Sequence, residues 1–273
     1  MSPLDYSGIA LFSDLDGTLF NSNRQVSPEN RRALERFIAG GGLFGISTGR
    51  SPSNASRLMP GVPINTWSVV LNGAEAYQFS TGTVAFPQTL THLRMAVFVK
   101  EVLERLPDVN VLLCSESRLL FLSDRSRVDK RFWDSHQPAR FCSLGEALSY
   151  PWLKVMFCAP REVLERLERG AEARGIFDIC DRVYTNINYL EFLPVGANKG
   201  VCLHKLRNME ELLGRKFVAV GDWTNDLELL READVAVAVE NALPEVKSLA
   251  DYITCSHDDH AIAYLIDRIL PAL

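Results

Sequence analysis

The chain has 273 residues, 47% of them hydrophobic, and a formal net charge of -5. This length can bury the core of one large domain or of two smaller ones. The mild acidity argues against general binding to nucleic acid, because no stripe of lysine and arginine could neutralise phosphates along a strand. A few local cations could still hold a small anionic substrate.

Further absences limit the class of protein. The six cysteines form no close C-x-x-C pair and lie mostly among apolar neighbours, which favours reduced thiols in a core. No apolar run approaches the roughly 18 residues of a membrane span. The first residues, MSPLDYSG, show no basic region followed by an apolar core. We therefore expect a cytoplasmic protein with no membrane partner.

The N-terminal third alternates strands with a helix. Residues 9–14 form a short apolar run typical of a buried strand, and Ser27 then Pro28 predict the start of a helix that Gly40 to Gly42 end. Residues 43–47 and 68–72 are predicted as the second and third strands. This order favours a parallel sheet with crossover connections.

The middle of the chain differs, because hairpins lie next to one another and helices are segregated. This organisation predicts an α+β unit with an antiparallel sheet. The expected elements are a hairpin at 75–86, a helix at 93–106, a hairpin at 109–122, a strand at 152–159, a helix at 161–174 and a strand-like stretch at 183–194.

The alternating pattern returns at Lys199. Helices are expected at 199–213, 226–233, 244–250 and 258–270, and strands at 217–222, 235–239 and 252–254. We therefore predict an α/β fold. Residues 1–83 and 185–273 would form a Rossmann-like parallel-sheet core, and residues 84–184 an inserted α+β cap domain.

Polar residues stand where the predicted parallel strands end. Ligands of open parallel sheets bind beyond the carboxyl ends of the strands. The residues expected there are Asp14 and Asp16 after the first strand, Thr48, Gly49 and Arg50 after the second, Asn72 after the third, Asp222 after the strand at 217–222, and Lys199, Asn225 and Asp226 at the starts of flanking helices.

Asp14 and Asp16 would repel each other in so confined a place unless positive charge offset them. A hard divalent cation, for which we expect Mg²⁺, would take oxygens from this set and relieve the repulsion. Mg²⁺ also favours a phosphorylated substrate, whose oxygens fill its remaining positions.

Taken singly, several motifs could suggest other ligand sites, but each of these interpretations is less favoured than the phosphate and metal site above. DLDG does not complete a calcium loop, and the glycines at 40, 42 and 45 run from helix into strand, the reverse of a dinucleotide fingerprint. ANKG lacks the spacing of a phosphate-binding P-loop. His257 and His260, beside two aspartates, could suggest a metal, but a helix-cap region is favoured.

Four motifs in order resemble the haloacid dehalogenase superfamily of phosphatases: DLDGT, STGR, Lys199 in ANKG, and GDWTND. NGA at Asn72 and VENA at Asn241 are similar to the Cof-like branch, which carries a type IIB cap. Trp223, Glu240 and His260 depart from the usual pattern without removing a catalytic group.

The resemblance implies that Asp14 is the nucleophile and Asp16 the general acid and base. It places the metal on Asp14, the Asp16 backbone carbonyl and Asp222, with Asn225 and Asp226 in support. The remaining expected roles are phosphate binding by Leu15 (through its amide), Thr48, Gly49, Lys199 and Asn225, and substrate binding by Arg50 and Asn72.

The expected activity is Mg²⁺-dependent hydrolysis of small phosphomonoesters, with sugar phosphates favoured, through an aspartyl phosphate on Asp14. A carboxylate at position 16 can activate water, which favours hydrolysis over a long-lived acyl phosphate. A phosphotransferase or phosphomutase of the same fold, and a catalytically silent module that binds a phosphorylated ligand, remain the alternatives.

Overall fold

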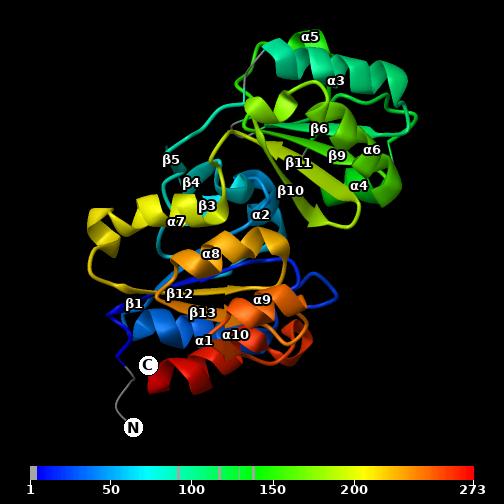
Figure 1. Cartoon of the computed structure of the whole chain (residues 1–273). Coiled ribbons are helices and arrows are strands. Elements are labelled where there is room, and N and C mark those ends of the chain that lie inside the picture. Colours follow the sequence, from blue (N-terminus) through cyan, green and yellow to red (C-terminus); the bar gives the residue numbers. More distant parts are fainter. Residues whose placement is uncertain (1–4, 91–92, 116–117, 129, 137–138) are drawn as a thin grey trace. The chain divides into compact units, whose positions relative to one another are not determined.

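The computed structural model describes residues 5–90, 93–115, 118–128, 130–136 and 139–273. These residues form two compact units (Figure 1). The first comprises the described residues up to Arg50, residues 55–86 and residues 198–273, and the second comprises residues 51–54 and 87–197. The second unit is therefore inserted into the first.

The first unit is built on a five-stranded parallel sheet, which confirms the predicted α/β class. Its strands, in spatial order, are β14 (Tyr252–Ile253), β13 (Val235–Ala238), β12 (Lys216–Gly221), β1 (Ile9–Ser13) and β2 (Leu43–Ile46). Ser13, the last residue of β1, pairs with Val220 of β12 and Ile46 of β2. The residues that follow these three strands therefore emerge at one edge of the sheet.

Helices cover both faces of this sheet, with α1 and α10 on one side and α7 and α8 on the other (Figure 1). Ser27 caps α1 and Pro28 opens it, as the sequence predicts. The helices are α1 (Pro28–Ala39), α2 (Pro52–Leu58), α7 (Lys199–Arg207), α8 (Leu227–Glu232), α9 (Pro244–Leu249) and α10 (Ala261–Tyr264).

The third predicted strand is shorter than expected and belongs mainly to another sheet. β3 (Ser68–Val70) pairs antiparallel with β4 (Glu75–Gln78), which pairs with β5 (Thr83–Ala85) in the expected hairpin. A single parallel bridge, Ser47 to Val69, links β3 to the end of β2. Residues 71 and 72, predicted to continue the strand, lie instead in a tight turn at Leu71–Gly73.

The second unit contains a six-stranded sheet and its own helices. Only the pair β7 and β8 is parallel among the neighbouring strands of this sheet in the described residues. In spatial order the strands are β10 (Asp181–Asn186), β11 (Tyr189–Leu193), β9 (Lys154–Cys158), β6 (Asn110–Ser115), β7 (Arg118–Phe121) and β8 (Arg140–Phe141). The helices are α3 (Leu93–Arg105), α4 (Lys130–Ser135), α5 (Leu144–Ala147) and α6 (Arg161–Glu172).

The expected boundary at residues 184 and 185 falls inside β10, so that part of the predicted division needs correction. β10 pairs with β11, and β11 pairs with β9. These ladders keep residues 185–197 in the second unit, whose last residue is Ala197.

Two predicted helices have other bounds than expected, since one ends early and the other begins late. α7 stops at Arg207 because Asn208 caps it and Met209 is extended, and only a separate turn at Glu210–Leu212 follows. The C-terminal helix begins at Ala261 after a turn at His257–Asp259. Beyond Tyr264 it continues as a π-helix over Leu265–Ile269. The sequence did not predict the bounds of α2, nor the elements α4, α5 and β8, which are all short.

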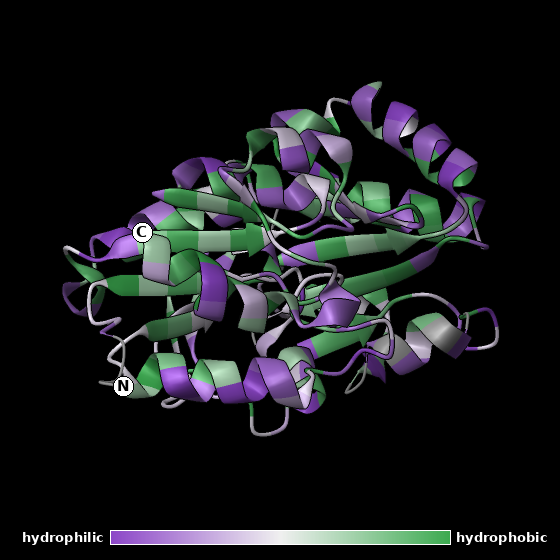
Figure 2. Ribbon diagram, turned by 90° about the horizontal axis from the view of Figure 1, so that it is seen from below, coloured by the Kyte–Doolittle hydropathy of each residue, from purple (hydrophilic) through white to green (hydrophobic). Residues whose placement is uncertain are grey.

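Each unit has a separate hydrophobic core. Phe12 and Phe217 belong to the core of the first unit, and Phe157 and Phe192 belong to that of the second. Figure 2 shows largely hydrophobic strands, whereas the helices mix hydrophilic with hydrophobic residues. All six cysteines are free thiols, as expected. Within the described part of the chain, every helix is too short or too polar to cross a membrane.

Candidate active site

Asp14 and Asp222 follow directly after β1 and β12, two neighbouring parallel strands. Their backbones are tied together, since the Asp14 amide donates to the Val220 carbonyl at 2.9 Å. Both side chains are nearly buried, with residue exposures of 6% for Asp14 and 9% for Asp222. Burial, the largest cause, raises the pKa of each carboxyl, that of Asp222 to about 7.

Lys199 joins this pair from the first turn of α7, where Asn198 caps the helix with its side chain. Its Nζ lies 2.6 Å from Oδ1 of Asp14 and 2.6 Å from Oδ1 of Asp226. Burial alone would lower the pKa of Lys199, but the two carboxylates outweigh it and raise that pKa. The lysine is therefore a buried, charged link between two acids.

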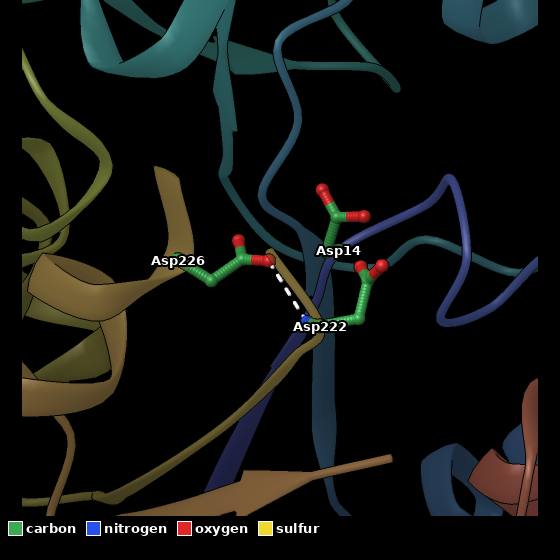
Figure 3. Close-up of side chains that lie close together, drawn as sticks. All are labelled: Asp14, Asp222 and Asp226. Atoms are coloured by element: carbon green, nitrogen blue, oxygen red, sulfur yellow. Dashed lines mark hydrogen bonds between the residues drawn. The ribbon is translucent and has the colours of Figure 1, made fainter. Parts of the chain in front are cut away.

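Asp14, Asp222 and Asp226 form an acidic cluster in which one ligand atom from each lies within 4.8 Å of the others (Figure 3). Asp226 is fully buried, and its Oδ2 accepts from the Asp222 amide at 3.0 Å. Three carboxylates and one lysine leave the cluster short of positive charge. Oxygen ligands with excess negative charge suit a hard divalent cation.

The side chain of Asp16 turns away from the acidic cluster and pairs with Arg50. The guanidinium donates from Nε and Nη2 to the two carboxylate oxygens, both at 2.6 Å. Burial would raise the pKa of Asp16, but Arg50 outweighs it and lowers that pKa. Arg50, expected as a substrate contact, is engaged with Asp16 in this structure.

Thr48 and Gly49 lie at the end of β2, beside the first strand. The Ser47 amide donates to the Ser13 carbonyl at 2.8 Å, and Thr48 is 1% exposed. Thr48 Oγ1 accepts from the Arg50 amide at 3.1 Å. The side chain of Leu15 is fully buried, so only its backbone could serve a ligand.

Asn72 and Asn225, which are 153 positions apart, meet through their side chains. Nδ2 of Asn225 donates to Oδ1 of Asn72 at 3.0 Å. The sequence predicted both residues near the site but gave no sign of this bond.

Thr18 is a site residue that motif reasoning passed over. Its Oγ1 donates to Oδ1 of Asp222 at 3.0 Å, which lowers the pKa of that acid against the larger effect of burial. Gly17 has a φ of +82°, and a Cβ there would come within 2.5 Å of Oδ2 of Asp222. The threonine and glycine of DLDGT were the available signal.

The loop after Asp14 is held by residues near the end of the chain. Asn241 Nδ2 donates to the Gly17 carbonyl at 2.8 Å, and Asp258 accepts from the Ser22 amide and hydroxyl, each at 2.7 Å. His257 Nδ1 lies 2.8 Å from the Phe20 carbonyl. The segment around His257 thus contains a cap, as expected, and also holds this loop.

None of the three departures from the family pattern belongs to the acidic cluster. Trp223 donates its amide to Oδ2 of Asp226 at 3.2 Å. Glu240 pairs with Lys247 at 3.5 Å. His260 has a φ of +65°, a conformation that glycine adopts without strain.

Comparison with known proteins places the chain in a family. Residues 11–266 match the model of the haloacid dehalogenase-like hydrolases. Because that match spans most of the sequence, the chain belongs to this family. Membership of the Cof-like branch, expected from the motifs, is confirmed.

Curated relatives share about a quarter of their residues with the chain. A Bacillus subtilis protein named 5-amino-6-(5-phospho-D-ribitylamino)uracil phosphatase YwtE is 25% identical, over 94% of this chain and 96% of its own. An HMP-PP phosphatase of Serratia proteamaculans is 27% identical, over 86% and 85%. A chloroplastic Arabidopsis thaliana protein named endoribonuclease YBEY is 26% identical over 94% of this chain, but the chain spans only 46% of its length.

Solved structures agree on the fold. A haloacid dehalogenase-like hydrolase from Bacteroides thetaiotaomicron has a TM-score of 0.81 and 23% identity, over 95% of this chain and 98% of its own. A sugar phosphatase of haloacid dehalogenase subclass IIB has a TM-score of 0.77 and 21% identity, over 95% and 98%. These likenesses confirm the predicted Rossmann-like class with an inserted cap.

Proposed function

We propose that this phosphoric monoester hydrolase is a Mg²⁺-dependent phosphatase that works through an aspartyl phosphate on Asp14. The observation that carries the proposal is the buried cluster of Asp14, Asp222 and Asp226 with Lys199, at the carboxyl ends of β1 and β12. Phosphoryl transfer needs an in-line nucleophile and positive charge on the phosphoryl oxygens. The cluster offers the nucleophile, one fixed cation and ligands for another.

The donor set fits Mg²⁺, because the ligands are carboxylate oxygens and their charge exceeds that of Lys199. Asp14, Asp222 and the Asp16 backbone carbonyl would hold the ion, and Asn225 and Asp226 would support them. Bound there, Mg²⁺ would neutralise charge on the phosphoryl group.

In the first half of the reaction, a carboxylate oxygen of Asp14 attacks phosphorus while the bond from phosphorus to the ester oxygen breaks. Asp16 gives its proton to the departing oxygen. Before it can do so, its carboxylate must leave Arg50, with which it is paired in this structure, and take up a proton from water. Arg50 would then contact the substrate.

In the second half, Asp16 takes a proton from water and the oxygen of that water attacks the phosphorus of the aspartyl phosphate. The bond between Asp14 and phosphorus breaks, which releases inorganic phosphate and restores the carboxylate. The groups proposed to hold the phosphoryl oxygens in both steps are the Leu15 amide, Thr48, Gly49, Lys199 and Asn225.

The relatives support a small phosphorylated metabolite as the substrate. The names of two of them specify phosphorylated small molecules, and one structural neighbour is named as a sugar phosphatase. We propose sugar phosphates as the preferred class, and a cytoplasmic location in keeping with it. A phosphotransferase of the same fold would differ in its acceptor, so product analysis separates the two.

The test is a panel of phosphorylated metabolites assayed for released phosphate with Mg²⁺, with Ca²⁺ and after chelation. We expect hydrolysis that depends on Mg²⁺ and is highest on sugar phosphates. Ca²⁺ should support it poorly, since its larger and looser coordination would misplace Asp14. Full activity after exhaustive removal of metal would contradict the metal assignment.

The inserted unit is proposed to select the substrate. All the expected site residues lie in the first unit, whereas cap segments of such enzymes can exclude water and add contacts. Replacing residues 87–197 by a short linker should abolish most selectivity within the panel while the acidic cluster stays intact. Unchanged selectivity in a folded variant would assign substrate choice to the first unit.

A further inference from the structure

The turn after β3 has an unusual backbone. Leu71, Asn72 and Gly73 have φ values of +51°, +56° and +92° in succession. Residues other than glycine adopt this region only at an energetic cost, and asparagine does so most readily. Such a conformation persists where the surrounding structure imposes it, and it is frequent at functional sites.

The turn lies against three of the family motifs. The amides of Leu71 and Asn72 donate to the carbonyls of Arg50 at 3.1 Å and Thr48 at 3.0 Å. A Cβ on Gly73 would come within 2.1 Å of the Asn198 carbonyl, at the start of the helix that carries Lys199. The backbone of this turn is thus fitted between the end of β2 and the start of α7.

The side chain of Asn72 completes the arrangement. It is 2% exposed, and its carboxamide occupies the space that a Cβ on Gly49 would need, 2.9 Å from that position. Its Oδ1 accepts from Nδ2 of Asn225 at 3.0 Å. One buried amide therefore touches both Gly49 and Asn225.

We infer that Asn72 is a positioning residue. It sets the orientation of the Asn225 side chain and the position of the Gly49 backbone and does not bind the substrate itself. The inference rests on the proposed function, in which Gly49 and Asn225 hold phosphoryl oxygens. The left-handed turn is the means by which a short side chain reaches both partners. Asn72 thereby changes from an expected substrate contact into part of the support for the phosphate site.

The test is a double-mutant cycle with Asn72→Gly, Asn225→Ala and their combination. Glycine suits the left-handed backbone, so Asn72→Gly removes the carboxamide without adding strain. We expect the Kd for inorganic phosphate, measured by calorimetry with Mg²⁺, to rise about 10-fold, and kcat to fall by at least as much. The thermal midpoint should stay within about 3 °C of wild type.

In the Asn225→Ala background, the same replacement should change Kd and kcat by less than about threefold, because the Asn225 amide is already gone and only the contact with Gly49 is left to lose. His260→Gly is the matched control. It relieves a left-handed φ of +65° outside the site and should leave kcat unchanged.

Three results would overturn the inference. They are full additivity in the cycle, a rise in KM for organic substrates with no change in phosphate affinity, and a large fall in the thermal midpoint with kcat unchanged. A wild-type protein that binds phosphate but hydrolyses no phosphomonoester would defeat only the proposed function, since the binding cycle would still decide the role of Asn72. A wild type that neither binds nor hydrolyses would defeat both.

Discussion

Each unit of the molecule buries a lysine against carboxylates, but the charges balance differently. In the inserted unit, Lys154 pairs with Glu191 at 2.9 Å, both nearly inaccessible, and Thr185 donates to the same glutamate. In the first unit, Lys199 contacts two carboxylates and a third lies beside them. A buried pair of opposite charges has no net charge and needs no further ion. A buried cluster with a net negative charge favours the binding of a cation.

Removing the proposed nucleophile should have the largest effect. Asp14→Asn preserves shape but has no carboxylate to attack phosphorus, so kcat should fall at least about 10⁴-fold on every substrate. Mass spectrometry should find no phosphoenzyme. Glu191→Gln, the matched change in the inserted unit, should leave kcat for nitrophenyl phosphate within about threefold. Equal losses in both variants would erase the distinction between the two clusters.

Asp16→Asn should fail at a later step. Nitrophenolate leaves without a proton, so the first transfer to Asp14 survives, but no base remains to activate water. Rapid mixing should show a burst approaching one nitrophenolate per active site, followed by a phase at least about 100-fold slower than wild type. Steady turnover near the wild-type rate would show that Asp16 is not the base. Asp14→Asn, which should give no burst, is the control.

The two lysines can be compared directly. Lys199→Met should lower kcat about 100-fold or more, because the phosphoryl group loses a fixed cation. Lys154→Met should instead lower the free energy of unfolding by about 3 kcal/mol, since the buried charge of Glu191 loses its lysine, while kcat per folded molecule changes little.

Adding Glu191→Leu to Lys154→Met should restore most of that stability, because a buried pair can be replaced by apolar residues at little cost. Urea unfolding and steady-state kinetics measure the two effects. A stability loss in Lys199→Met with unchanged kcat would make both lysines structural.

The smallest expected effect concerns pH in the metal-free protein. Burial and then Asp226 raise the pKa of Asp222 from 3.8 to about 7, so the folded state binds this proton more tightly than the unfolded state. The resulting stability is complete below pH 3.8 and is lost as pH rises through about 7. Between pH 5 and 8, the thermal midpoint of wild type should fall by about 5 °C relative to Asp222→Asn. Saturating Mg²⁺ should abolish this difference, and a wild type that gained stability over that range would contradict it.

The sequence predicted the position of several candidate site residues at one edge of the sheet, because these residues directly follow buried strands. Once the parallel order of β1, β2 and β12 is predicted, Asp14, Thr48 and Asp222 must emerge at one edge. Periodicity and caps also located the long helices α1, α3 and α6.

The side-chain pairings could not be read in the same way. Arg50 with Asp16, and Asn225 with Asn72, depend on rotamers and on a left-handed turn, neither of which leaves a periodic signal. The boundary at residue 184 was misplaced because a β-ladder holds β10 to β11, and such pairing depends on tertiary context.

The sheet order also has a consequence for biosynthesis. β1 needs β12 beside it, Ile9 opposite Lys216, and the loop after Asp14 is fastened by Asp258. A nascent chain therefore cannot complete this site until nearly all of these residues have left the ribosome. Every strand in the sheet of the inserted unit comes from residues 87–197. This unit can therefore fold before the first unit is complete. Until β12 has been synthesised, β1 has an unpaired edge on that side, and an unpaired strand edge is prone to pair with other chains.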